Sequence, residues 1–340
     1  MTEIIIIVLS IALLIYVLLG GADFGAGIIE IFTGRRGMDV ISKAIAPVWE
    51  ANHVWVILAV VILFNGFPTV YTTISTFLHI PILIVLLGIV LRGSAFTFRY
   101  YDVIKDKSHY YYTLFFRTSS VIAPFFYGVI LGAIMLGRIP GDTTVGSFFD
   151  IYMAPWLNFF TLTTGLFVTV LFGWLASVFM IGETKNTDDT ALFVKLSKVF
   201  FILLIVTGMA VFLTAEIYEV HFFREFIKSP VSISAVVLAT ILIPVLWRSF
   251  NHQKAIVTRM LTGVETALII IGWYAIQFPV MVYIATGDHL TVYNSRAPQS
   301  TMQMLFWALI VGILIIFPSI GYLMKVFKFD EKDDHLKSSS

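Results

Sequence analysis

Long apolar segments recur along this chain and restrict what it can fold into. A membrane-spanning helix needs about 20 predominantly apolar residues, and nine segments close to that length occur. They cover residues 4–32, 46–67, 73–96, 113–136, 156–181, 197–217, 231–247, 260–284 and 301–323. The connections between them are polar or rich in Pro and Gly, as in TGRRGMDVISK and GETKNTDDT. We therefore predict an all-α, polytopic integral membrane protein with nine transmembrane helices, grouped into two four-helix bundles and one extra helix.

The composition also favours a membrane protein over a soluble one. Of the 340 residues, 59% are hydrophobic and 13% are charged, whereas soluble domains average about 45–50% apolar and about 25% charged residues. The absence of cysteine excludes disulfides, thiolate metal sites and cysteine nucleophiles. The first apolar segment lacks a basic n-region and is too long for a signal peptide, so we expect it to be the first spanning helix. We assign residues 1–325 to a single transmembrane domain and residues 326–340 to a polar cytoplasmic tail.

Basic residues fall mainly on one side of the predicted membrane. The loops after the first, third, fifth and seventh segments, together with the C-terminal tail, hold 17 of the 22 basic residues. The opposite loops hold Arg138, Arg224, Lys228 and Arg296, and Arg92 lies within the third segment. Because cytoplasmic loops carry an excess of Lys and Arg, we predict that the N-terminus lies outside and the C-terminus in the cytoplasm.

The stretch LLGGADFGAG places Asp23 inside the first apolar segment. A carboxylate in a spanning helix is costly, so it needs a partner or a function. Gly21 and Gly25 form a small-xxx-small pair, which allows a neighbouring backbone to approach closely. Two interpretations stay open at this point: a packing face on which Asp23 is hydrogen-bonded to a neighbour, or a functional acid.

A second polar motif, IAPVWEANHVW, opens the second apolar segment. Glu50 and His53 are three residues apart and therefore share one face of a helix. Trp49 is four residues before His53 and lies on the same side, while Asn52 and Trp55 add polar and amphipathic groups. We treat Trp49, Asn52 and Trp55 as candidates for orienting the acid and the imidazole or for contacting a partner.

Four of these side chains could form a ladder for protons. Glu30 lies near the cytoplasmic end of the first segment, and Asp23 lies roughly 14 Å deep. Glu50 and His53 lie roughly 6 Å and 10 Å inside the second segment from the same side. Carboxylate and imidazole groups can relay protons when their surroundings bring their proton affinities close together. The alternative is a single structural contact between Glu50 and His53 that joins two helices.

Arg92 ends the polar set in the third segment, within the motif LRGSAFTFR. An arginine without a partner would be costly at this depth. We therefore expect it to pair with Asp23 or Glu50.

Three further ionisable groups inside the segments are His79, Glu216 and Glu265. A lone histidine such as His53 or His79 could be an axial haem ligand. No two histidines stand four residues apart within a segment, so we expect no histidine-rich metal site and no cofactor bound directly by this chain.

Four motifs, GADFGAG, APVWEANHVW, FNGFPTVY and LRGSAFTFR, occur in this order within the first hundred residues. In order and spacing they resemble subunit II of the cytochrome bd-type quinol oxidases. The late stretch FPVMVY and the following LTVYNSRAPQSTMQML extend the resemblance across the chain. The chain also departs from the family: Leu290 to Ser300 reads LTVYNSRAPQS where many members read closer to LTVWDASSS, and Thr97 stands where an acid is common. Some relatives have Asp and Gln at the positions of Glu50 and His53.

The resemblance implies a function. Such oxidases reduce oxygen to water with electrons from a membrane quinol and take up the protons from the cytoplasm. The b- and d-type haems and the quinol-oxidising loop belong to subunit I, so subunit II is implied to bind no haem or metal, to support subunit I and to help deliver protons through Asp23 and Glu50. The implied partners are subunit I, a small single-span accessory subunit and the lipid of a bacterial or archaeal-type cell membrane, with no nucleic acid.

Three alternatives stay open from the sequence. A proton-coupled secondary transporter would carry broken helices at matching positions of two inverted halves, and the glycines near Asp23 mark a break of this kind in one half only. A purely structural assembly subunit would need no proton path. A subunit that binds haem itself would use His53 or His79.

Overall fold

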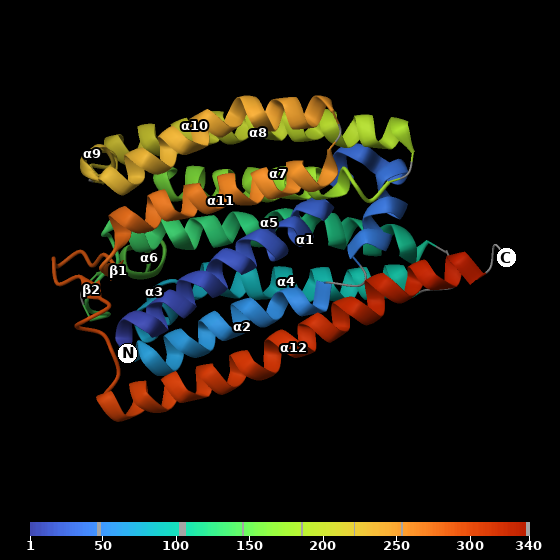
Figure 1. The fold of residues 1–340 in the computed structure, drawn as a ribbon. Coiled ribbons are helices and arrows are strands. Elements are labelled where there is room, and N and C mark those ends of the chain that lie inside the picture. The colour runs from blue at the N-terminus through green and yellow to red at the C-terminus, as the bar shows by residue number, and fades with distance from the viewer. Residues whose placement is uncertain are drawn as a thin grey trace.

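The structure is a computed structural model that describes residues 1–45, 49–101, 107–144, 146–184, 186–220, 222–252 and 254–337. Helices account for nearly all of the regular structure in these ranges (Figure 1). They are α1 (Thr2–Ile45), α2 (Trp49–Gly66), α3 (Pro68–Phe77), α4 (His79–Tyr101), α5 (Ser108–Leu136), α6 (Phe148–Tyr152), α7 (Phe159–Met180), α8 (Thr187–Ile217), α9 (Phe222–Lys228), α10 (Pro230–Asn251), α11 (Ala255–Gln277) and α12 (Gln299–Lys337). Two short strands, β1 (Val280–Val282) and β2 (Leu290–Thr291), pair antiparallel.

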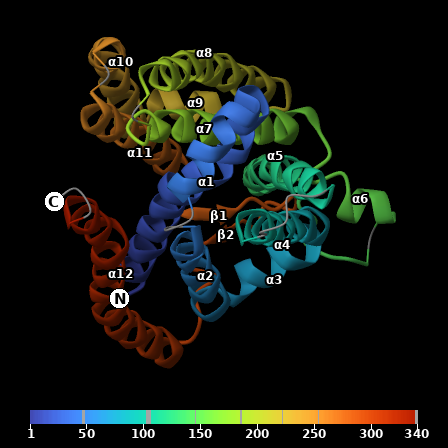
Figure 2. The same ribbon diagram turned by 90° about the vertical axis from the view of Figure 1, so that its right-hand side faces the viewer.

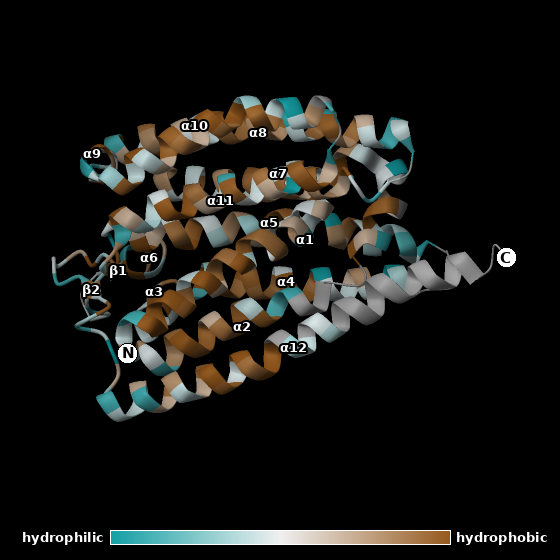
Figure 3. Ribbon diagram, viewed as in Figure 1, coloured by the Kyte–Doolittle hydropathy of each residue, from teal (hydrophilic) through white to brown (hydrophobic). Residues whose placement is uncertain are grey.

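Within the described ranges, eight helices are long and apolar enough to cross a membrane, or nine if the bent pair α2 and α3 counts as one span. The chain is therefore a multi-pass helical membrane protein, as the apolar segments predict. Figure 3 shows the same pattern, with hydrophobic colour along the middle of the helices and hydrophilic colour gathered at their ends.

The predicted second and third segments differ from the helices in one place. The third segment was expected at 73–96, whereas α4 runs from His79 to Tyr101. The residues before it form the separate helix α3, which leaves α2 at a bend of 112°. Pro68 occupies the start of α3, where its missing N–H costs little. The apolar residues of α3 resemble those of a spanning segment in the sequence. In the structure α3 lies at the end of the bundle (Figure 1), where Val70 and Phe77 are buried.

The helices lie side by side with α1 near the centre (Figures 1 and 2). α1 packs on α2, α5 and α7, and α5 packs in turn on α4. α7 packs on α8, α10 packs on α11, and α12 lies along α2. The N-terminus, α3, α6, α9 and both strands lie at one end of the bundle, and the second half of α12 extends to the other (Figure 1).

The divergent loop Leu290 to Ser300 closes the end of the bundle that holds the N-terminus. Asn294 accepts a hydrogen bond from the backbone N–H of Thr291 at 2.7 Å and donates one to the carbonyl of His289 at 2.9 Å. The backbone N–H of Ala297 donates to the carbonyl of Gly66 at 2.8 Å. The loop is thus held by its own turn and by the end of α2.

Small residues let α1 and α7 approach closely. A Cβ atom added at Gly25 would overlap the carbonyl oxygen of Phe172 on α7, and one at Gly21 would lie 2.9 Å from the side chains of Phe172 and Leu175. The neighbour of the Gly21–Gly25 pair is therefore a helix of the same chain.

Candidate functional site: a buried line of charges between α1, α4 and α5

Asp23 on α1 and Arg92 on α4 form an ion pair in the interior of the bundle. Arg92 donates from Nη1 to Oδ2 of Asp23 at 2.9 Å and from Nη2 to Oδ1 at 2.7 Å. Nη2 also donates to the backbone carbonyl of Asp23 at 2.7 Å. The exposed fractions of the two side chains are 1% and 2%. A two-pronged contact of this kind is among the strongest that a carboxylate can make, and it accounts for two charges at a depth that penalises either one alone.

Glu30 lies further along α1 and binds two arginines. Arg99 of α4 donates from Nη1 to both carboxylate oxygens of Glu30, at 2.8 and 3.0 Å. Arg117 of α5 donates from Nε to Oε1 of Glu30 at 3.0 Å. Arg99 also donates to the hydroxyl of Ser42 at 3.1 Å. The Glu30 side chain is fully buried, and its two cations leave this level of the bundle with one positive charge in excess.

The two levels repeat with a period of two helical turns. Asp23 and Glu30 are seven residues apart on α1, and Arg92 and Arg99 are seven apart on α4, which is about 10 Å along a helix. Phe116 of α5 separates the levels: its ring centroid lies 5.2 Å from Cζ of Arg92 and 4.2 Å from Cζ of Arg99. Contacts of a guanidinium with an aromatic face add stabilisation when both are desolvated.

Hydroxyl groups continue the line along the same stripe of α1. Ser120 of α5 lies against Gly27, which stands between Asp23 and Glu30 on α1. The Ser120 hydroxyl is buried and has no hydrogen-bond partner in the described part of the chain. Two turns beyond Asp23, the hydroxyls of Tyr16 and Tyr127 lie 2.9 Å apart.

His53 approaches this line from α2. Its ring meets that of Phe24 edge to face with centroids 6.2 Å apart, and its Nδ1 atom is buried without a hydrogen-bond partner among the described residues. Asn52 donates to the carbonyl of Leu19 at 3.4 Å, and Trp55 is buried in the hydrophobic core of this chain. Both side chains thus hold α2 against its own neighbours.

Glu50 and Trp49 belong to the first turn of α2. Their side chains fall outside the described residues. The part of the ladder that runs through Glu50 stays a prediction.

The other ionisable candidates lie away from the line. Nδ1 of His79 lies 2.9 Å from the carbonyl oxygen of Thr76, and its ring meets Tyr152 edge to face. Glu216 is exposed. Glu265 of α11 is buried, and its Oε1 atom has no hydrogen-bond partner within the described ranges. The rings of His53 and His79 each pack edge to face on an aromatic side chain.

Several members of this site do not stand out in the sequence. Arg99 and Arg117 count among the basic residues of the cytoplasmic side, whereas they lie within α4 and α5 and reach Glu30. Ser120, Tyr16 and Tyr127 were not singled out. The signal that could have found Arg99 is the shared spacing, because two acids and two arginines at the same seven-residue interval can pair level by level.

The chain resembles known proteins over nearly its whole length. Residues 1–327 match the family model described as cytochrome bd terminal oxidase subunit II. The chain is 26% identical over 320 residues to cytochrome bd ubiquinol oxidase subunit 2 of Bacillus subtilis, a match that covers 91% of this chain and 90% of that protein. It is 27% identical over 175 residues to cytochrome bd-I ubiquinol oxidase subunit 2 of Escherichia coli, over 51% of this chain and 43% of that protein.

A solved structure shares the fold. A chain of the bd oxidase from Geobacillus thermodenitrificans superposes with a TM-score of 0.77 at 17% sequence identity. The match covers 96% of this chain and 98% of that chain.

Proposed function

This chain belongs to the cytochrome bd terminal oxidase subunit II family, and on that premise we propose that it helps deliver protons to the oxygen-reducing site of a haem-carrying partner. It is a subunit of a quinol oxidase complex. The proposal concerns what this chain itself contributes, because the electron-transfer chemistry of such a complex depends on haem and quinol. Membership of the family removes the secondary transporter from the alternatives.

The line of polar groups along α1 carries the proposal. Tyr16, Asp23 and Glu30 follow one another at two-turn intervals and cover about 21 Å of helix. The hydroxyl of Ser120 between the two acids can donate and accept a hydrogen bond, and so can the Nδ1 side of His53 in its two tautomers. Polar and ionisable groups inside a membrane bundle commonly form proton-transfer paths. The groups along α1 are long enough in extent to form such a path through much of this bundle.

The residues along this line have different tasks. Asp23 and Glu30 are ion-paired with arginines. We therefore assign two roles to these ion pairs: they fix the positions of the groups along the path, and they set the electrostatic potential along it. Glu50 stands at the start of α2, on the side that carries most of the basic residues, and we assign to it proton entry. Ser120 and His53 are the hydrogen-bonding steps between the levels.

The wider arrangement follows from the same premise. We propose b- and d-type haems, or b-type haems only, in subunit I, with quinol as the substrate of the complex and a small single-span accessory subunit as a further partner. The N-terminus faces outward, the nine spans form two four-helix bundles and one extra helix, and residues 326–340 form a polar cytoplasmic tail of the domain 1–325. The membrane is the cell membrane of a bacterial or archaeal-type cell.

Glu50→Gln tests the proton role. The amide keeps the shape and most of the hydrogen bonding but loses the titratable group, so the complex should assemble with haem and lose most quinol-driven oxygen reduction. Glu216→Gln, which removes an exposed acid from α8, is the matched control and should keep full turnover. The measurement is turnover per haem together with the rate of membrane-potential formation in reconstituted vesicles. Near wild-type values for Glu50→Gln would refute the proposal.

A purely structural role is the second candidate. The observation that favours it is that Asp23 and Glu30 are already ion-paired by arginines. The proton role predicts normal assembly with low turnover. A purely structural role predicts instead that substitutions along the line lower the yield of complex while turnover per assembled haem stays constant.

A further inference from the structure

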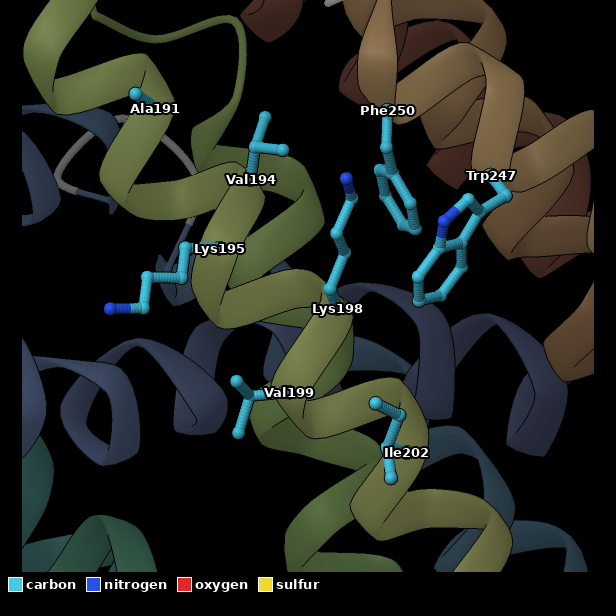
Figure 4. A pocket seen from close by; sticks show the side chains of 8 residues that line it. All are labelled: Ala191, Val194, Lys195, Lys198, Val199, Ile202, Trp247 and Phe250. Carbon is cyan, nitrogen blue, oxygen red and sulfur yellow. The ribbon is translucent and has the colours of Figure 1, made fainter.

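A hollow opens between α8 and α10, away from the line of charges. Its volume is about 460 Å³. Lys198 of α8 points into it toward Trp247 and Phe250 of α10 (Figure 4), and the ammonium nitrogen of Lys198 lies 5.3 Å from the Trp247 ring centroid. A cation beside an indole at the mouth of an apolar hollow is a combination suited to a ligand with a charged head and an apolar body.

The position of Lys198 along α8 matches the boundary of a bilayer. From residue 199 to residue 215 the chain carries no charged side chain, and these 17 residues span about 26 Å of helix. That length is close to the hydrocarbon thickness of about 30 Å. Lys198 is therefore the last cation before the hydrocarbon, at the level of the phosphate groups.

The hollow continues toward the hydrocarbon as an apolar surface. Val199 and Ile202, which also line it, are 44% and 54% exposed. Acyl chains can lie against this surface while a headgroup stays beside Lys198.

The charge around the hollow is positive. Lys195, one turn before Lys198 on α8, also lines it, and its side chain extends along the other flank of the helix (Figure 4). The nearby acids Asp189 and Asp188 both lie close to Arg36, at 2.5 and 4.0 Å. Two lysines one turn apart can reach a common phosphate, because the ammonium group sits on a flexible four-carbon stem.

We propose that this hollow between α8 and α10 binds one anionic phospholipid, with its phosphate at Lys198 and Lys195 and its acyl chains along Val199 and Ile202. The lipid belongs to the leaflet on the side of the basic loops. The binding concerns a surface distinct from the proton path, so it does not depend on the proposed function.

Lysine acetylation in the intact complex tests the site directly. The complex is placed in nanodiscs of dioleoylphosphatidylcholine, with or without dioleoylphosphatidylglycerol, and acetylation of each lysine is followed by mass spectrometry. The anionic lipid should slow acetylation of Lys198 and Lys195 by about fivefold, the factor expected for roughly one strong contact per lysine. Lys43 and Lys107, exposed at the same end of the bundle, are internal controls and should react equally in both discs.

Charge removal gives the second measurement. Native mass spectrometry of a phosphatidylglycerol titration should show about fivefold weaker binding of the tightest lipid for Lys198→Gln and about 25-fold weaker binding for Lys195→Gln/Lys198→Gln. The matched double variant Lys43→Gln/Lys107→Gln should bind as the unaltered complex does.

Three results would overturn the proposal. The first is equal acetylation of Lys198 with and without the anionic lipid. The second is full protection already in phosphatidylcholine, which would mean that the hollow is covered without any anionic lipid. The third is equal protection by inorganic phosphate at the same concentration, which would mean that the hollow binds a free anion and not a lipid. None of these outcomes depends on turnover, so they are separate from a failure of the proton proposal.

Discussion

Neutralising Asp23 should destabilise the protein far more than neutralising a surface acid. Asp23→Asn removes the charge that faces Arg92 and leaves a guanidinium that is 1% exposed. Breaking a buried ion pair by removing one partner costs about 3–5 kcal/mol, because the remaining charge is uncompensated. Three hydrogen bonds from Arg92 to Asp23 and the near-complete burial of both groups place this pair at the upper part of that range.

The matched control is the exposed pair of Glu225 and Lys228 on α9. These side chains lie 3.5 Å apart and are 55% and 71% exposed. An exposed pair contributes about 0–1 kcal/mol, so Glu225→Gln should leave stability nearly unchanged. The two substitutions are chemically equivalent, a carboxylate to its amide, and differ in burial.

The assay is the midpoint temperature at which the purified complex loses its haem absorbance and its size-exclusion peak. At about 2 °C per kcal/mol for a chain of this size, the upper part of that range corresponds to a midpoint lowered by about 8–10 °C in Asp23→Asn. The double variant Asp23→Asn/Arg92→Gln removes both charges and should recover at least half of the loss. If the single variant is as stable as the Glu225→Gln control, or the double variant is less stable than the single one, the assignment of a stabilising buried ion pair is wrong.

Three further predictions concern packing, the imidazole and the orientation of the chain. Gly25→Leu should sharply lower the yield of folded chain, because its side chain would enter the backbone of α7 at Phe172; Gly263→Leu is the control, since nothing lies near a Cβ there, and equal yields would contradict the close packing. His53→Gln should keep substantial turnover, because an amide can still donate and accept a hydrogen bond at the edge of the line; a complete loss, measured per haem, would make the imidazole an obligatory proton carrier. Reporter fusions should indicate the cytoplasm or the outside according to the excess of basic residues, and inverted signals at two or more sites would refute the orientation. The cytoplasmic sites follow Met38, Asp106, Asn186 and Gln253, and the outside sites follow Asp142 and His289.

Much of the fold could be predicted because apolar length is a direct physical requirement of a membrane span. Bends are harder to predict: α3 is apolar enough to be read as a spanning segment, and only the turn at Phe67 and Pro68 separates it from α2. The close approach at Gly25 was indicated by the small-residue spacing. Which helix it approaches depends on tertiary packing, and no local pattern in the sequence identifies α7.

The candidate site was predicted in part for a similar reason. Asp23, Glu30 and Arg92 stood out because each is a charge within an apolar segment. Arg99 and Arg117 did not stand out, since both lie near the ends of helices, where long basic side chains usually reach water. From sequence alone, a basic residue near a membrane boundary is predicted to be exposed to solvent unless a buried acid is known to face it.

The ion pairs also change what a substitution along this line can mean. Sequence alone suggests that replacing Asp23 by Asn removes a proton carrier and leaves the structure intact. With Arg92 bound to both of its oxygens, the same substitution strands a buried cation, so loss of turnover in Asp23→Asn alone does not distinguish slower proton delivery from weaker assembly. Asp23→Asn/Arg92→Gln separates the two effects, because it leaves no stranded charge and still lacks the acid. If the double variant assembles and turns over normally per haem, Asp23 acts only by holding α1 against α4; if it assembles and stays slow, the field or the proton affinity of the acid is needed for delivery.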